Sequence, residues 1–187
     1  GDVYKRQVID CAKVVAAGAC YDGDPWDLVI TPRWIKKALP IYSVLTLSAT
    51  GSEMDPFAVI SDMSKNEKWG TSSEHMKPKM SILDPEYTYS VSKKQTAAGT
   101  ADMISHICEN YFTNVKNADV QARFAEGLLK NCFKYGPIAL EEPDNYDARA
   151  NLMWTASMAI NGILSDGAEV SWCVHPMEHE LSAFYDI

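Results

Sequence analysis

The first half of the chain alternates short apolar runs with polar breaks. From Val8 to Ala19, apolar residues recur three and four positions apart, and this spacing predicts a helix. The motif DGDPW then interrupts the pattern with glycine and proline. Residues 41–48, IYSVLTLS, are short, apolar and rich in strand formers, so they predict a buried strand.

Two more strand signals pair into a hairpin, and a third stands alone. Residues 58–62 and 68–72 flank a polar turn at 64–66, which predicts a β-hairpin. Residues 79–83, KMSIL, predict another short strand. The character of the first 90 residues is therefore α/β.

After Tyr87 the strand signals stop and helical periodicity takes over. One helix is predicted from about residue 92 to 112, with Gly99 as a candidate break. Three more are predicted to begin near residues 117, 144 and 175. The pattern therefore predicts an α/β domain over residues 8–90 and an all-α domain over 91–187. Residues 1–7 fit neither and are interpreted as a non-native leader.

Composition excludes several classes of function. The formal net charge of -8 argues against a nucleic-acid surface, and no apolar run reaches the ~18 residues of a membrane span. We therefore expect no nucleic-acid or membrane partner. The five cysteines are odd in number and lack C-x-x-C spacing, so they are interpreted as reduced thiols, mostly in the core, of a cytoplasmic protein.

Asp102 and His106 stand four residues apart in the first predicted helix of the second domain. A carboxylate and an imidazole on adjacent turns can bind one metal ion, with the O and N ligands that Zn or Fe accept. The alternative is a surface ion pair. Apolar neighbours such as Ile104 and Ile107 favour burial, and a buried pair needs a reason.

His175 and His179 form a second pair with the same helical spacing. Both imidazoles would point the same way, which indicates metal binding, although Glu178 does not complete the H-E-x-x-H motif of zinc peptidases. Two histidines on a helix surface are the alternative. His75 lies in a polar loop and is expected to be solvated.

The segment TLSATGSE, residues 46–53, follows the predicted buried strand. Residues 50–53 have the form of a capping box, which predicts the start of a helical turn. Gly51 permits close approach of the backbone, and the N–H and hydroxyl groups suit a phosphate or a carboxamide. A plain capped turn is the alternative. Pro56 should end the turn, so we expect an exposed loop at the carboxyl end of a strand, where ligands bind in open α/β sheets.

Five segments together carry a family resemblance: VIDCAKVVAAGACYDGDPWDL, TLSATGSEMD, KPKMSILDPEYT, GTADMISHICENYF and VHPMEHELSAFYDI. In this order they resemble the iron-containing alcohol dehydrogenase family, and most nearly its butanol dehydrogenase-like branch. The resemblance implies part of a Rossmann-like nucleotide-binding domain plus part of a helical metal-binding domain, an architecture shared with dehydroquinate synthase.

The resemblance also implies roles for individual residues. Asp102, His106 and His175 match metal ligands for Fe(II), with Zn(II) as the alternative. His179 matches a histidine beside the reacting centre. The residues of the loop that contacts NAD or NADP are Thr46, Ser48, Thr50, Gly51 and Ser52.

Two departures from the family pattern indicate a fragment. YKRQ stands where the family has a Gly-Gly-Gly-Ser turn, and the fourth metal ligand is expected about two positions beyond Ile187. We therefore expect this chain alone to be inactive.

The function implied for the full-length enzyme is hydride transfer between a primary alcohol, butanol-like, or its aldehyde and NAD(P). That enzyme could form a homodimer. The alternatives are a zinc-dependent enzyme related to glycerol dehydrogenase or dehydroquinate synthase, and a helical metal-binding module without catalysis.

Overall fold

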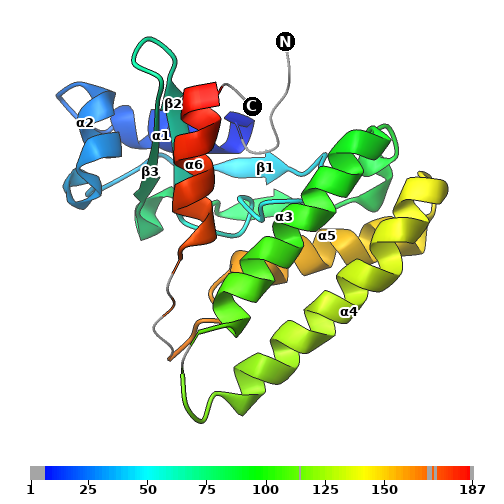
Figure 1. Ribbon diagram of the computed structural model, residues 1–187. Helices are drawn as coiled ribbons and strands as arrows, with labels where there is room; N and C mark the ends of the chain where they lie inside the picture. The colour runs from blue at the N-terminus through cyan, green and yellow to red at the C-terminus, as the bar shows by residue number, and fades with distance from the viewer. Residues whose placement is uncertain (1–6, 114, 168–169, 171, 186–187) are drawn as a thin grey trace. The chain divides into compact units, whose positions relative to one another are not determined.

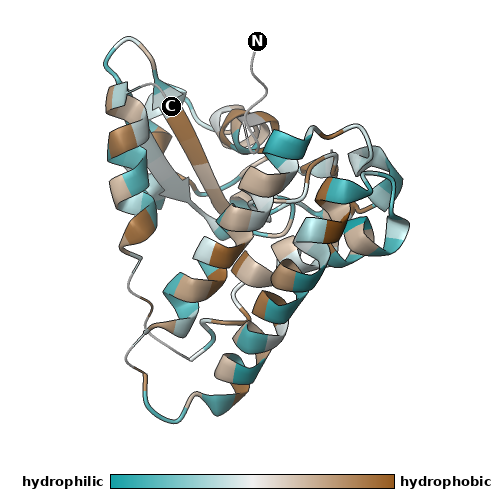
Figure 2. Ribbon diagram, turned by 45° about the vertical axis from the view of Figure 1, so that its right-hand side comes forward, coloured by the Kyte–Doolittle hydropathy of each residue, from teal (hydrophilic) through white to brown (hydrophobic). Residues whose placement is uncertain are grey.

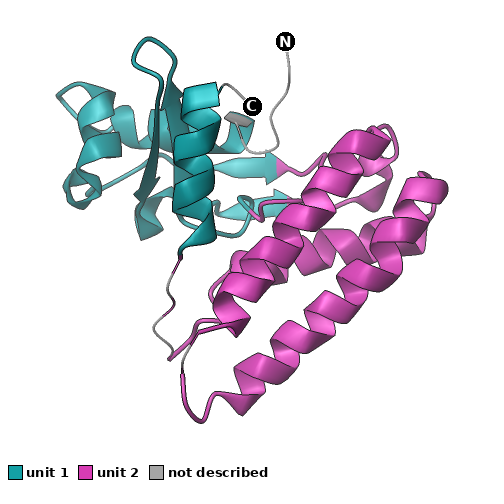
Figure 3. Cartoon of the chain, viewed as in Figure 1, with its two compact units in different colours: residues 1–43, 52–81, 173–187 teal, residues 44–51, 82–172 magenta. Residues whose placement is uncertain are grey.

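The computed structural model describes residues 7–113, 115–167, 170 and 172–185. Residues 1–6 of the predicted leader lie outside this range. The chain forms two compact units (Figure 3): unit 1 comprises residues 1–43, 52–81 and 173–187, and unit 2 comprises residues 44–51 and 82–172. Each unit combines segments that are distant in sequence. The continuous domain limits expected from the sequence, between residues 90 and 91, stay a prediction.

Unit 1 is built around an antiparallel hairpin (Figure 1). Strands β2 (Phe57–Asp62) and β3 (Glu67–Ser72) pair from Phe57↔Ser72 to Asp62↔Glu67, which confirms the predicted hairpin. Asn66 lies in the turn with φ of 52°, a conformation that asparagine tolerates better than most residues. Three α-helices pack against the hairpin: α1 (Gln7–Gly18), α2 (Pro25–Ile30) and α6 (Val174–Tyr185). Two short 3₁₀ helices, η1 (Pro32–Trp34) and η2 (Glu74–Met76), contact α2 and α1 respectively.

Helix α1 forms where its period predicts, and its most buried side chains include a charged pair. Val8 and Val15 are 72% and 62% exposed, whereas Asp10 and Lys13 are completely buried. Behind them, Ala17 packs in a small core with Leu28, Ile35, Ala58 and Met76. The apolar spacing therefore predicts this helix but does not mark its buried face, because a charged pair takes the centre of that face.

The strand predicted over residues 41–48 is shorter and more exposed than expected. Only β1 (Tyr42–Val44) forms, and it pairs with β4 (Met80–Ile82) in a two-stranded sheet. Side chains alternate across the strand: Tyr42 and Val44 are exposed, while the flanking Ile41 and Leu45 are buried. The chain passes between the two units within both strands of this sheet.

Unit 2 is a layered group of three long helices, α3 (Lys93–Tyr111), α4 (Asp119–Glu141) and α5 (Tyr146–Ile160), with the 3₁₀ helix η3 (Pro85–Thr88). The Ser92 and Asn145 side chains cap α3 and α5 by accepting from backbone N–H groups of the first turn. The apolar residues between the helices form the main core: Met103, Ile107, Ala125, Cys132, Ala139, Ala148, Leu152, Ala156, Ala159 and Leu164. All four helices predicted after Tyr87 are therefore confirmed.

Hydropathy varies along the helices of unit 2, as Figure 2 shows by its mixture of brown and teal. On α4, Phe124 and Phe133 are exposed even though their neighbours Leu128 and Cys132 pack inward. Among the described residues, no helix is both long and apolar enough to span a membrane.

Two glycines let backbone segments of unit 2 approach closely. Helix α3 continues unbroken through Gly99, so the predicted break there was wrong. A Cβ at Gly99 would lie 2.5 Å from the Ser48 carbonyl oxygen, and one at Gly136 would lie 2.8 Å from Cγ2 of Thr100. Gly99 therefore allows the chain at residue 48 to lie against α3.

The cysteines are less buried than expected. Only Cys132 is buried, on α4, while Cys11 and Cys173 are exposed. The interpretation of the cysteines as mostly core residues was wrong.

Candidate functional site

Asp102 and His106 lie one turn apart on α3, so the regular helix places them on the same side. His106 is only 1% exposed and Asp102 is half-buried. A surface ion pair would leave both groups in water, so this burial argues against that alternative. The pair therefore presents a carboxylate and an imidazole at a position that is partly shielded from solvent.

The His106 ring is held by its surroundings within unit 2. Trp172 packs edge-on against it, with ring centroids 6.1 Å apart and planes at 75°. The side-chain amide of Asn110 donates to the His106 carbonyl oxygen at 2.7 Å. Met103 and Ile107, on either side of His106 in α3, are core residues. The imidazole thus has a well-defined direction.

The loop of residues 46–53 is more buried than expected. Ala49, Gly51, Ser52 and Glu53 are all buried, so the expectation of an exposed loop was wrong. Residues 52–54 form a single turn, and no helix begins at the predicted capping box. The turn ends within three residues because the chain enters strand β2 at Phe57.

Two close contacts of unit 2 position this loop. The Ser48 carbonyl lies against Gly99 of α3, three residues before Asp102. Gly51 has φ of +68°, and a Cβ there would lie 2.3 Å from Cγ2 of Ile160 and 2.7 Å from the Ala156 carbonyl oxygen. The structure therefore brings the loop from Ser48 to Gly51 beside the helix that carries Asp102 and His106.

The predicted cofactor-binding side chains differ in their surroundings. Thr46 is exposed and Thr50 is half-buried. The Ser48 hydroxyl oxygen is buried and has no hydrogen-bond partner within the described part of the chain. A buried hydroxyl without a partner is unfavourable, so Ser48 has capacity for a ligand group.

The Ser52 hydroxyl is engaged within unit 1. It accepts from the Lys13 ammonium at 2.9 Å and donates to Oδ1 of Asp10 at 2.5 Å. Sequence reasoning missed Asp10, Lys13 and their partner Asp55. The available signal was a charged pair three residues apart in an otherwise apolar helix.

His175 and His179 lie one turn apart on α6 and are half-buried. Helix α6 packs on strand β3 within unit 1, where the Lys68 ammonium donates to Ser182 Oγ at 2.9 Å and to Glu178 Oε2 at 3.3 Å. The His179 Nε2 atom lies 3.7 Å from Glu178 Oε2. The Asp102–His106 pair therefore belongs to α3 in unit 2, and the His175–His179 pair belongs to α6 in unit 1.

The chain matches two family descriptions over most of its length. Residues 7–85 match the family described as iron-containing alcohol dehydrogenase, and residues 96–187 match its C-terminal part. The chain belongs to the iron-containing alcohol dehydrogenase family. The α/β beginning and the helical continuation are those of this family, which confirms the predicted fold class.

Relatives of this chain carry names that refer to alcohols or aldehydes. It is 62% identical over 179 residues to NADH-dependent butanol dehydrogenase A of Clostridium acetobutylicum, covering 96% of this chain and 46% of the relative. It is 43% identical to the NADPH-dependent aldehyde reductase YqhD of Escherichia coli, covering 96% and 47%. The chain therefore spans about half the length of these relatives.

A solved structure gives the same picture. The crystal structure of NADH-dependent butanol dehydrogenase A from Thermotoga maritima matches with a TM-score of 0.92 at 47% identity, covering 96% of this chain and 45% of that one. The predicted resemblance to the butanol dehydrogenase-like branch is confirmed.

Proposed function

We propose that this chain belongs to a metal-dependent alcohol dehydrogenase or aldehyde reductase that transfers hydride between a primary, butanol-like alcohol and NAD(P). The observation that carries the proposal is the buried Asp102–His106 pair on α3 in a chain of the iron-containing alcohol dehydrogenase family. The names of its relatives, butanol dehydrogenase and aldehyde reductase, support this substrate class.

The donor groups fit the proposed metal. Asp102, His106 and His175 each offer one ligand atom, a carboxylate oxygen or an imidazole nitrogen. This mixture of O and N donors suits Fe(II) or Zn(II). Edge-on packing by Trp172 restrains the His106 ring, which a ligand position requires. When bound, the metal supplies a Lewis acid for the substrate oxygen.

The chain's own residues then bind, orient and move a proton. His179 lies one turn beyond His175 and is half-buried, so its imidazole can exchange a proton with both substrate and solvent. We propose that it takes up the proton that the alcohol hydroxyl loses and returns it in the reverse direction. The loop residues Thr46, Ser48, Thr50 and Gly51 would orient the nicotinamide cofactor, which supplies the hydride chemistry when bound.

The buried Ser48 hydroxyl supports the cofactor assignment, because a carboxamide or phosphate group would satisfy it. Any contact of Ser52 with the cofactor would have to come from its backbone, since Asp10 and Lys13 engage the hydroxyl. A helical metal module without catalysis would need no such loop. The choice between NAD and NADP stays open, and a cytoplasmic location and a homodimer stay predictions.

A segment-exchange experiment tests this function. In butanol dehydrogenase A of C. acetobutylicum, the matched segment, 46% of that protein, would be replaced by this chain. We expect the chimera to oxidise NADH when butanal and Fe(II) or Zn(II) are present. The chimera carrying Asp102→Ala should lose activity, whereas His75→Ala, which alters an exposed residue of the 3₁₀ helix η2, should keep it. A chimera that folds and binds NADH but does not reduce butanal would contradict the proposal. The isolated chain is expected to be inactive.

A further inference from the structure

A charged network lies completely inside unit 1. It consists of Asp10 and Lys13 of α1 together with Ser52 and Asp55 from the segment before β2. All four residues are at most 1% exposed. Burying charges is costly unless each one is paired and hydrogen-bonded. A completely buried network of this kind is therefore expected to have a role other than packing.

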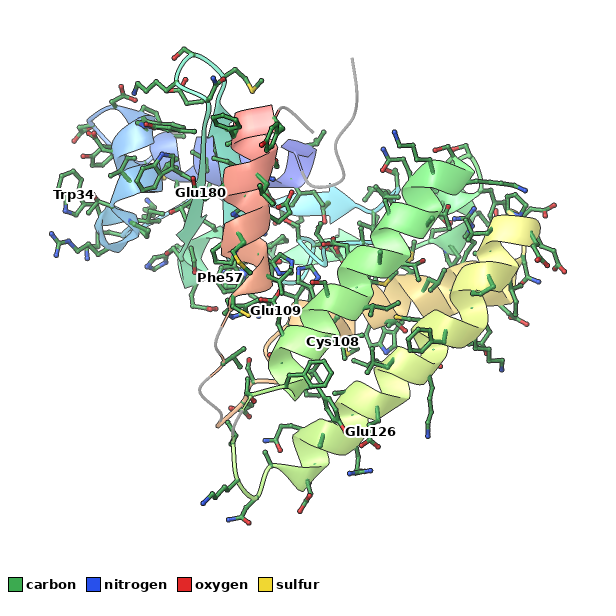
Figure 4. The ribbon with its side chains drawn as sticks, viewed as in Figure 1. Trp34, Phe57, Cys108, Glu109, Glu126 and Glu180 are labelled. Carbon is green, nitrogen blue, oxygen red and sulfur yellow. The ribbon has the colours of Figure 1, made fainter. Side chains whose placement is uncertain are left out.

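The Lys13 ammonium uses its three protons on one short segment. It donates to Ser52 Oγ at 2.9 Å, to Asp55 Oδ1 at 2.8 Å and to the Phe57 carbonyl oxygen at 2.7 Å. All three acceptors lie within six residues of each other and at least 39 positions from Lys13. Figure 4 labels Phe57, where this segment enters β2. A single cation therefore sets the path of the whole segment.

Asp10 completes the anchoring one turn earlier on α1. Its Oδ1 accepts from the Ser52 hydroxyl at 2.5 Å, and its Oδ2 accepts from the Val59 N–H at 2.8 Å. The Asp55 carboxylate in turn accepts from the Phe57 N–H at 2.8 Å. The helix thus holds both the turn at Ser52 and the start of β2.

This anchored segment continues directly from the proposed cofactor loop. The chain leaves unit 2 at Gly51 and enters unit 1 at Ser52. Gly51 is held by its close approach to α5, and Ser52 is held by Lys13 and Asp10 of α1. Because Gly51 and Ser52 are joined by a peptide bond, the contacts that fix Ser52 also restrict the orientation of the last peptide groups of the loop.

We propose that Lys13 is a positioning residue for the cofactor loop, acting through Ser52 and Asp55. The inference rests on the proposed function for its cofactor, whereas the anchoring itself is a property of this chain. A positioning role predicts that loss of the Lys13–Asp55 charge pair loosens residues 51–59 and weakens nicotinamide binding. Metal binding by α3 and α6 should stay as it is, because neither helix contributes to the network.

The test compares four versions of the full 187-residue chain: wild type, Lys13→Met, Asp55→Asn and the control Lys36→Met, which removes an exposed lysine. Asp55→Asn keeps the shape and the acceptor oxygen but removes the charge, so it remains informative if Lys13→Met does not fold. We expect amide hydrogen exchange at Phe57 and Val59 to rise about tenfold in both network variants and to stay unchanged in Lys36→Met. Amides of α3 should be unaffected in all versions.

Fluorescence titration with NADH supplies the functional measurement. The Kd for NADH should rise about fivefold or more in the network variants, while the Kd for Zn(II) changes less than about twofold. If Lys13 had a purely structural role, its loss would instead weaken the binding of both NADH and Zn(II). Unchanged exchange at Phe57 and Val59, or an unchanged NADH Kd beside faster exchange, would overturn the inference. If wild type binds no NADH, the proposed cofactor site fails, and the exchange result alone decides whether Lys13 anchors the segment.

Discussion

Replacing Gly99 by alanine perturbs the contact between α3 and the proposed cofactor loop. The added Cβ would lie 2.5 Å from the Ser48 carbonyl oxygen and 3.2 Å from the Ala49 Cβ, so the loop or the helix must shift. Overpacking of this kind costs ~1–3 kcal/mol, whereas alanine gains up to ~1 kcal/mol of helix propensity over glycine. The net effect should be a destabilisation of about 0–2 kcal/mol.

Gly127→Ala is the matched control, because Gly127 lies inside α4 with nothing within 4 Å of a Cβ. This variant keeps the gain in propensity and has no clash, so it should be more stable than wild type by ~0.5–1 kcal/mol. Urea denaturation followed by circular dichroism gives both free energies of unfolding. We expect Gly99→Ala to be less stable than Gly127→Ala by roughly 1–3 kcal/mol. Equal changes in the two variants would show that the Gly99 contact does not restrict the loop.

Two predictions concern titrating groups. Burial raises the pKa of the Cys132 thiol to about 11, so iodoacetamide at pH 8 should label Cys11 and Cys173 well before Cys132; mass spectrometry showing equal labelling would refute the burial of this thiol. A hydrogen bond from the Ser64 side chain lowers the pKa of Asp62. The ionised carboxylate therefore stabilises the hairpin at pH values above the ordinary pKa of a carboxyl group. This stabilisation is lost as the pH falls through the lowered pKa. An NMR titration should therefore find the Asp62 pKa higher in Ser64→Ala than in wild type, and an unchanged value would count against the hydrogen bond.

Local patterns were sufficient to predict most elements of the fold. The period of α3 predicts its extent, since helical spacing depends on neighbours within a few positions. The hairpin was predictable for the same reason, because its two strands are joined by a short polar turn. Gly99 was misjudged because its small size serves contact with a distant loop and not a bend.

Burial was harder to predict wherever it depends on distant partners. Asp10 and Lys13 are buried because Ser52 and Asp55 pair with them from about 40 positions away. In the sequence alone, charged residues in a helix indicate its solvent face, and the apolar Val15 indicates its core face. The cofactor loop was expected to be exposed because Pro56 should end its turn, whereas its close contacts come from the distant helices α3 and α5.

The candidate metal site shows the same division. Asp102 and His106 could be paired from the sequence, because a regular helix places residues four apart on one side. The buried apolar neighbours of His106 were also visible in the pattern. The packing of Trp172 against the His106 ring could not be predicted, since it joins segments 66 residues apart. The assignment of the ligands stays a prediction that experiment must decide.

Titration of the chain with Co(II), a spectroscopic substitute for Fe(II) or Zn(II), tests the central claim most directly. Visible absorption would report Co(II) binding to wild type, Asp102→Ala and His179→Ala. The variant His179→Ala is the control, because the His179 imidazole lies one turn from His175 and is proposed not to bind the metal. We expect Asp102→Ala to bind Co(II) at least ~10-fold more weakly than wild type and His179→Ala to bind within about twofold. Wild type without a Co(II) spectrum, or Asp102→Ala with unchanged affinity, would contradict the metal site.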